Sequence, residues 1–143
     1  MHIKIVLIGK IKEKAYNDKI QKYLEWLSRD AKFEIVTVKD SNSHKIIYQI
    51  DKHKKRNFFS VCLSEHGKDL NSISFSKFIF NSGEKIVFFL GGPNGIPKNI
   101  IEAMDFNLSL SKMTMPHEMA ALILVEQLFR AFSIKKGSKY HRD

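Results

Sequence analysis

The sequence is poor in cysteine: Cys62 is the single one among 143 residues. One cysteine excludes an internal disulfide and a cysteine-based metal cluster, and we expect no metal site. Cys62 stands between Val61 and Leu63, so it is expected to be a small buried hydrophobic residue rather than a reactive thiol.

Long apolar runs are also lacking. No run approaches the roughly 20 residues of a membrane span, and residues 3–8 are too short for a secretion signal. There is no internal repeat, low-complexity segment or linker, so residues 1–143 are expected to form a single domain. We therefore expect a cytoplasmic protein that has no membrane partner.

The common phosphate-binding motifs are missing as well. The chain has neither Gly-x-Gly-x-x-Gly nor a loop ending in Gly-Lys-Ser/Thr. This argues against a nucleotide-dependent enzyme with an ordinary doubly wound fold.

Charge, in contrast, is abundant and one-sided. Lysine and arginine number 24 against 15 acidic residues, giving a formal net charge of +9. Such a balance predicts a polyanionic partner, nucleic acid first and an acidic membrane surface second, although a basic surface can also serve solubility alone. The basic groups lie at residues 10–14, at residues 52–56 and in the tail after residue 133.

Apolar patterns alternate between strand and helix along the whole chain, which predicts an α/β fold with a mostly parallel sheet of about five strands and helices on both faces. The predicted strands are residues 3–8, 33–38, 58–63, 86–90 and 108–110. The predicted helices are residues 15–28, 43–56 (capped by Ser41 or Ser43), 72–80 (capped by Ser72 or Ser74), 98–105 and 116–132. The last helix is apolar without a break over residues 119–125, so it is expected to be buried nearly all round. Glu126 and Arg130, four residues apart, are expected to pair.

A glycine-rich turn follows the strand at residues 86–90, with the sequence Gly91-Gly92-Pro93-Asn94-Gly95. Ligands of open α/β sheets bind at the carboxyl ends of strands, so this turn is a candidate ligand site. By itself the motif is weak evidence, because a strand followed by a glycine turn is more often a plain turn. Residues 64–68 are expected to be a loop at the same edge.

Four motifs taken together are more specific. They are Leu90-Gly-Gly-Pro-Asn-Gly95, Leu108-Ser-Leu-Ser-Lys-Met-Thr-Met-Pro-His117, Glu126-Gln-Leu-Phe-Arg-Ala-Phe132 and Tyr140-His-Arg142. In this order and spacing, the chain resembles over its whole length the RlmH family, small SPOUT-class methyltransferases that modify N3 of a pseudouridine in large-subunit ribosomal RNA. One departure is Ala121, where relatives often carry arginine.

The resemblance implies a fold, a cofactor and partners. It implies a SPOUT-type sheet with a C-terminal trefoil knot, although connections in proteins are by default unknotted. It implies S-adenosylmethionine as cofactor, and 23S ribosomal RNA in the large subunit or assembled 70S ribosome as substrate. It also implies a homodimer, which the long apolar helix favours.

The resemblance also implies the site residues. The cofactor pocket would be formed by Leu63, Gly92, Ser111, Lys112, Met113, Thr114, Met115 and Pro116. A bulky residue at Gly92 is expected to abolish cofactor binding without unfolding the chain. The catalytic residues would be Tyr140, His141 and Arg142, in a tail that Gly137 and Ser138 make flexible and that closes over the target nucleotide. The alternative is an inactive SPOUT-fold module that binds ribosomes, against which the intact glycine turn and loop 111–116 argue.

Overall fold

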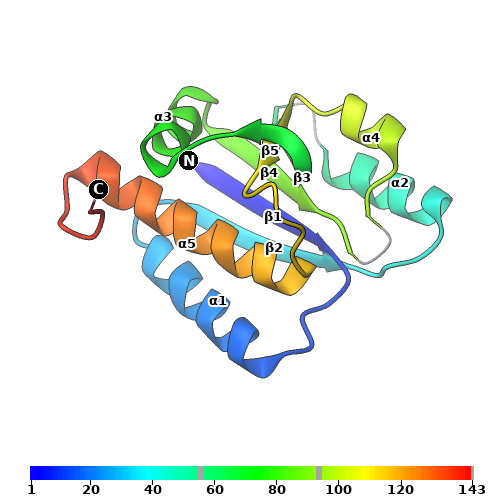
Figure 1. Ribbon diagram of the computed structural model, residues 1–143, viewed down its shortest axis with the longest axis horizontal. Helices are drawn as coiled ribbons and strands as arrows, with labels where there is room; N and C mark the ends of the chain where they lie inside the picture. The colour runs from blue at the N-terminus through cyan, green and yellow to red at the C-terminus, as the bar shows by residue number, and fades with distance from the viewer. Residues whose placement is uncertain (55–56, 93–94, 143) are drawn as a thin grey trace.

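The computed structural model describes residues 1–54, 57–92 and 95–142. Its five strands are β1 (His2–Ile8), β2 (Lys32–Val38), β3 (Phe59–Asp69), β4 (Lys85–Leu90) and β5 (Phe106–Ser109). They form one sheet in the order β2-β1-β4-β3-β5, and every neighbouring pair is parallel (Figure 1). The predicted α/β class is confirmed, with the parallel character complete.

Both faces of the sheet are buried, as the continuous apolar strands predict. In β1 the alternate residues Ile3, Ile5 and Leu7 belong to one core cluster. Their neighbours Val6 and Ile8 belong to the other cluster. The period of two along a strand thus divides a single apolar run between two cores.

Helices cover each face. The larger core is closed by α1 (Lys14–Leu27), α3 (Ser72–Asn81) and α5 (His117–Lys136). The smaller core is closed by α2 (Ser43–His53) and α4 (Lys98–Glu102). In Figure 1 α5 lies between α1 and α3, and it begins near the carboxyl ends of the strands.

The third strand differs from its prediction. Residues 64–68 are not a loop, because β3 continues to Asp69 and pairs again with β5 beyond a bulge, with Lys68 opposite Leu108. Gly67 permits this pairing, since a Cβ there would lie 2.7 Å from the backbone of Asn107. The fifth strand accordingly begins at Phe106, two residues earlier than predicted.

The helix caps also differ from the prediction. Asn42 caps α2 by accepting a hydrogen bond from the Lys45 amide at 3.1 Å, and Asn71 caps α3 by accepting one from the Ser74 amide at 2.8 Å. The prediction that serines cap these two helices was wrong. Asparagine is as good a cap as serine, and in both helices it occupies the position immediately before the first turn.

Helix α5 is longer and less buried than predicted. It ends at Lys136 rather than residue 132, and Gly137 terminates it with φ of 72°. The Glu126–Arg130 pair forms as expected, at 2.7 Å. One side of the helix is partly exposed, including Met119 at 36%, so burial is not nearly all round.

The trefoil knot stays a prediction. Within the described part of the chain, no helix has both the length and the apolar character needed to cross a membrane.

Cys62 is fully buried in β3, as predicted. Burial raises the pKa of its thiol to about 12. The group is therefore protonated and unreactive at neutral pH.

Glu118, in the first turn of α5, fixes the start of α1. Its Oε1 accepts hydrogen bonds from the amides of Lys12 and of Glu13, the latter at 3.0 Å. The bond from the Glu13 amide is the main cause that lowers the pKa of this carboxyl. A lowered pKa means that the carboxylate adds stability above its unfolded-state pKa and loses this contribution as pH falls through the folded-state pKa.

We predict that Glu118→Gln lowers the melting temperature at pH 7 and that the difference from the parent shrinks as pH falls below the ordinary pKa of a glutamate and through the lowered one. Thermal unfolding followed by circular dichroism across this range measures it. Glu25→Gln, the same change on the exposed side of α1, is the control. A deficit for Glu118→Gln that persists unchanged at pH 3 would contradict the electrostatic account.

Candidate functional site

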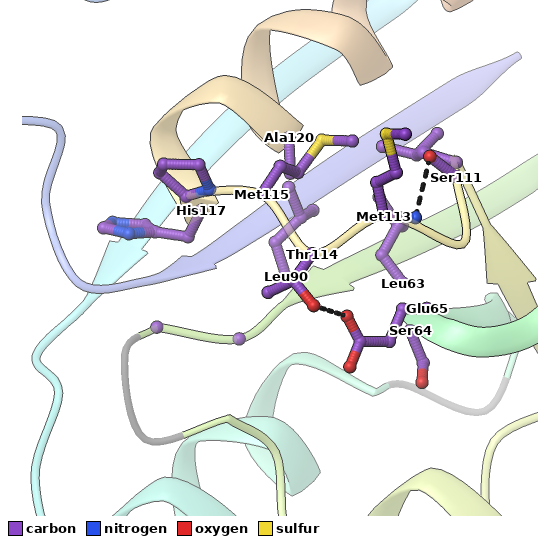
Figure 2. Close-up of a pocket in the computed structure, with 14 residues that line it drawn as sticks. Leu63, Ser64, Glu65, Leu90, Ser111, Met113, Thr114, Met115, His117 and Ala120 are labelled. Atoms are coloured by element: carbon purple, nitrogen blue, oxygen red, sulfur yellow. Dashed lines mark hydrogen bonds between the residues drawn. The ribbon is translucent and has the colours of Figure 1, made fainter.

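A pocket of about 590 Å³ opens at the carboxyl edge of the sheet (Figure 2). Leu63, where β3 reaches its bulge, is in register with Leu90 at the end of β4 and with Leu108 near the end of β5, so the three strands meet there. The pocket lies just beyond this row and is lined by Leu63, Ser64, Glu65, Leu90, Gly91, Gly92, Leu110, Ser111, Met113, Thr114, Met115, Pro116, His117 and Ala120. The edge predicted from strand direction is therefore the one that is hollowed.

The loop between β5 and α5 forms one wall. Ser109 Oγ donates a hydrogen bond to the Ser111 carbonyl at 2.9 Å, and the Met113 amide donates to Ser111 Oγ at 3.0 Å. These bonds fix the turn that brings Met113 and Met115 to the pocket, as Figure 2 shows. The loop is thus shaped by its own serines.

Glu65 is the acidic group of the pocket. Thr114 donates a hydrogen bond of 2.5 Å to Glu65 Oε2, which ties the loop to β3 (Figure 2). Among the described residues that line the pocket, Glu65 carries the one carboxylate. Sequence reasoning did not select it, because residues 64–68 were expected to be a loop. Its place two residues after Leu63 was the available signal.

Gly92 is required by a close approach to β1. A Cβ on this residue would lie 2.5 Å from the carbonyl oxygen of Ile8 and 3.1 Å from Asp40 Oδ2. Contact with a backbone oxygen cannot be relieved by a rotamer change. The glycine is therefore a packing requirement as well as part of the pocket wall.

His117 occupies the opposite wall, at the start of α5. Figure 2 shows its ring turned away from the methionines. A Cβ on Gly9 would lie 3.5 Å from its Nε2, so the ring faces the loop that follows β1. His117 Nε2 and Asp40 Oδ1 are both buried, and neither has a hydrogen-bond partner among the residues the structure describes. They retain hydrogen-bonding capacity beside the pocket.

The predicted cofactor residues converge with one exception. Leu63, Gly92, Ser111, Met113, Thr114, Met115 and Pro116 all line the pocket. Lys112 does not line it. Its exposed side chain lies with Nζ 3.6 Å from Asp69 Oδ2, and a cation pointing outward leaves the pocket without a lysine charge.

The predicted catalytic tail lies at the far end of α5 (Figure 1). Tyr140 packs edge-on against Phe129, with ring centroids 4.8 Å apart, and its hydroxyl donates to Glu126 Oε1 at 3.1 Å. Arg130 Nη1 donates to His141 Nδ1 at 3.1 Å. Residues 126–130, which the tail contacts, lie about 14–20 Å along the helix from its start at His117, so within one chain the tail and the pocket are apart.

The tail is folded back on α5 rather than extended as a flexible arm. Partial burial, aided by the nearby Glu126 carboxylate, raises the pKa of Tyr140 far above its ordinary value. Its hydroxyl therefore stays a proton donor at physiological pH. Because a guanidinium only donates, His141 accepts through Nδ1 in this arrangement.

Comparison with known proteins identifies the family of this chain. A family model described as "Predicted SPOUT methyltransferase" matches residues 1–141. The chain belongs to the SPOUT methyltransferase family. Membership implies a methyl donor for the pocket.

Curated relatives support the assignment. This SPOUT methyltransferase is 37% identical to a ribosomal RNA large subunit methyltransferase H from Prochlorococcus marinus, covering 99% of this chain and 97% of the relative. It is 34% identical to the protein of the same name from Carboxydothermus hydrogenoformans, covering 99% and 100%. A solved structure titled "The structure of a probable methylase family protein from Haemophilus influenzae Rd KW20" aligns with a TM-score of 0.60 at 11% identity, over 99% of this chain and 70% of that one. This last likeness concerns the fold.

We predict that Gly92→Ala in this SPOUT methyltransferase lowers the free energy of unfolding by about 1–3 kcal/mol, because its Cβ meets a fixed carbonyl. The expectation that a bulky residue at Gly92 abolishes binding without unfolding the chain stays a prediction, and this clash argues against its second half. Urea unfolding measures the loss. Gly83→Ala is the comparison, since its Cβ would meet nothing within 4 Å and only its φ of 96° opposes it. A Gly92→Ala protein as stable as the parent would contradict the packing argument.

Proposed function

We propose that the chain transfers a methyl group from S-adenosylmethionine to N3 of a pseudouridine in 23S ribosomal RNA, in the large subunit or the assembled ribosome, acting in the cytoplasm as a homodimer. The observation that carries the proposal is the pocket that β3, the end of β4 and the 111–116 loop form in a chain of the SPOUT methyltransferase family. The names of the curated relatives and the net charge of +9 support an RNA substrate.

The pocket suits the proposed cofactor in size and chemistry. About 590 Å³ is within the usual range for small-molecule sites. When bound, S-adenosylmethionine supplies an electrophilic methyl group on a cationic sulfonium. The Glu65 carboxylate is complementary to that charge, while Leu63, Leu90 and Met115 offer apolar surface. Lys112, the cation of the loop, points away.

The chain's own residues then have two tasks. The first is to hold the acceptor base in line with the methyl group, since positioning of this kind is worth on the order of 7–11 kcal/mol. The second is to help the N3 proton leave, by a positive environment or by a base. Arg142 suits the role of the positive environment, and His141 suits the role of the base. For His141 to accept a proton through Nδ1, its contact with Arg130 has to open when RNA docks.

A second subunit would bring the tail of one chain to the pocket of the other. Because about 14–20 Å of helix separates the tail's contacts at residues 126–130 from the start of α5, we infer that the tail enters the pocket of a partner. Met119 and Ile123, one turn apart near the start of α5, are partly exposed apolar residues. They suit an isologous contact between two copies of this helix.

The alternative function is an inactive ribosome-binding module with the same fold. It would retain the positive charge without needing the pocket. The intact wall at Gly92 and the hydrogen-bonded loop at Ser111 favour the enzyme.

We predict that the parent protein binds S-adenosylmethionine and that Ala120→Phe abolishes binding, because Ala120 lines the pocket and a phenyl ring would fill it. Isothermal calorimetry measures binding. Ala15→Phe, on an exposed turn of α1, is the matched control and should bind as the parent does. No binding to the folded parent would contradict the methyltransferase proposal and favour the inactive module.

We predict that a chain lacking residues 140–143 still binds S-adenosylmethionine but does not methylate, even at saturating ribosome. Co-expressed with the Ala120→Phe chain, it should regain activity, because the mixed dimer has one intact pocket facing one intact tail. Random pairing gives about a quarter of the parental sites, since half of the dimers are mixed and each has one working site. Single-turnover methylation of 70S ribosomes measures this.

Two inactive proteins that stay inactive together would contradict the shared site. A truncated protein that reaches the parental rate at higher ribosome concentration would show that the tail only adds affinity. Sedimentation of the parent as a monomer at micromolar concentration would exclude the dimer.

A further inference from the structure

A second hollow, of about 670 Å³, lies between α2 and β2, which is the edge strand of the sheet. It is separate from the cofactor pocket and shares none of its lining residues. We call it the α2 groove. It is lined by Val36, Thr37, Val38, Lys39, Ser41, His44, Lys45, Tyr48, Gln49, Lys52 and His53.

Helix α2 turns two different faces to its surroundings. Ile46 and Ile50 are buried in the smaller core. The groove-lining residues of the helix recur at spacings of three and four, which places them in one stripe on another side. Lys45 and Lys52, seven residues and so about two turns apart, therefore lie along the same stripe.

The charge of the α2 groove has a single sign. Lys39, Lys45 and Lys52 line it, and no carboxylate is among its described lining residues. Of the nearest acids along the chain, Asp51 does not line the groove, and Asp40 has its Oδ2 turned toward Gly92. Within the described residues, no ion pair engages any of the three lysines. The groove thus concentrates uncompensated positive charge.

The aromatic ring of Tyr48 lies between Lys45 and Lys52 in this stripe. Tyr48 is 66% exposed, although the core beneath α2 is closed by isoleucines. Packing gives no reason for a large ring at that position. Aromatic side chains among lysines are the combination that binds single-stranded nucleic acid, because bases stack while phosphates pair.

The α2 groove adjoins the cofactor pocket through Asp40. Lys39 and Asp40 directly follow β2, and Asp40 Oδ2 lies 3.1 Å from where a Gly92 Cβ would stand. Gly92 is itself a wall of the pocket. Lys39, next to Asp40, is therefore the groove lysine nearest to the pocket along the chain, and α2 extends about 16 Å beyond it.

We propose that the α2 groove binds the RNA strand that flanks the target nucleotide, with Lys39, Lys45 and Lys52 on its phosphates and Tyr48 stacked on one base. The proposal rests on the proposed function for the identity of the substrate. A membrane surface would need a wider apolar face than a single tyrosine provides.

The main test reverses charge in the groove. Lys45→Glu combined with Lys52→Glu should weaken binding to 70S ribosomes and to polyuridine RNA. It should also make the dependence of log affinity on log salt shallower by about 1.4–1.8, or 0.7–0.9 for each lost phosphate contact. The affinity for S-adenosylmethionine and the methylation rate at saturating ribosome should not change. Lys22→Glu combined with Lys77→Glu, exposed on α1 and α3, makes the same change in net charge and is the control.

A second pair of variants tests stacking without changing charge. Tyr48→Ala should weaken polyuridine binding roughly 5- to 150-fold, the range measured for base–aromatic stacking. Tyr48→Phe keeps the ring and should bind as the parent does. Circular dichroism of all variants checks that α2 remains folded.

Three results would overturn the proposal. They are a groove variant that binds RNA no worse than the control pair, a parent that does not bind polyuridine at low salt, and a groove variant that loses flotation with phosphatidylserine vesicles while keeping RNA binding. Because polyuridine binding needs no methylation, a parent that binds RNA through the α2 groove but not S-adenosylmethionine would overturn only the proposed activity.

Discussion

The structure depends on one close approach, that of the turn after β4 to the last carbonyl of β1. Glycine at position 92 allows it, because any Cβ would lie 2.5 Å from the Ile8 oxygen. The approach sets the turn beside Asp40, at the end of β2, and makes it a wall of the pocket. Pocket, sheet edge and α2 groove therefore share one rigid junction. A change that separates these backbones would alter both binding surfaces together.

Local patterns predicted much of the fold. Five apolar runs, each followed by a helical pattern, were enough for the class and for burial of both sheet faces. The errors lie where pairing between residues that are distant in the sequence determines the local structure. The second half of β3 is polar and contains Gly67, which locally indicates a loop, yet this glycine lets the strand approach Asn107 of β5. The choice of Asn42 and Asn71 as caps was decided by one residue of register, which sequence patterns do not resolve.

The candidate site was predictable in part for a similar reason. Backbone-rich segments such as the glycine turn and the loop at Ser111 carry their shape in their sequence. Glu65 was missed because its role depends on where β3 ends. The tail was misjudged because Gly137 and Ser138 suggest flexibility, whereas Glu126 and Arg130 on the preceding helix hold Tyr140 and His141. Tertiary contacts of this kind are not visible as a local pattern.

The lysines behind the net charge of +9 differ in whether an acidic side chain pairs with them. Four of the lysines that the structure describes are matched by acids and contribute little to an external field. Such pairs are Lys14 with Asp18, Lys98 with Glu102, Lys112 with Asp69 and Lys136 with Asp30. The lysines of the α2 groove have no such partner among the described residues. Their charge therefore adds to a positive field beside the edge of the sheet where the pocket opens. In the homodimer proposed above, an RNA strand bound there would lie beside the methyl donor, and the partner's tail would approach the base from the other side.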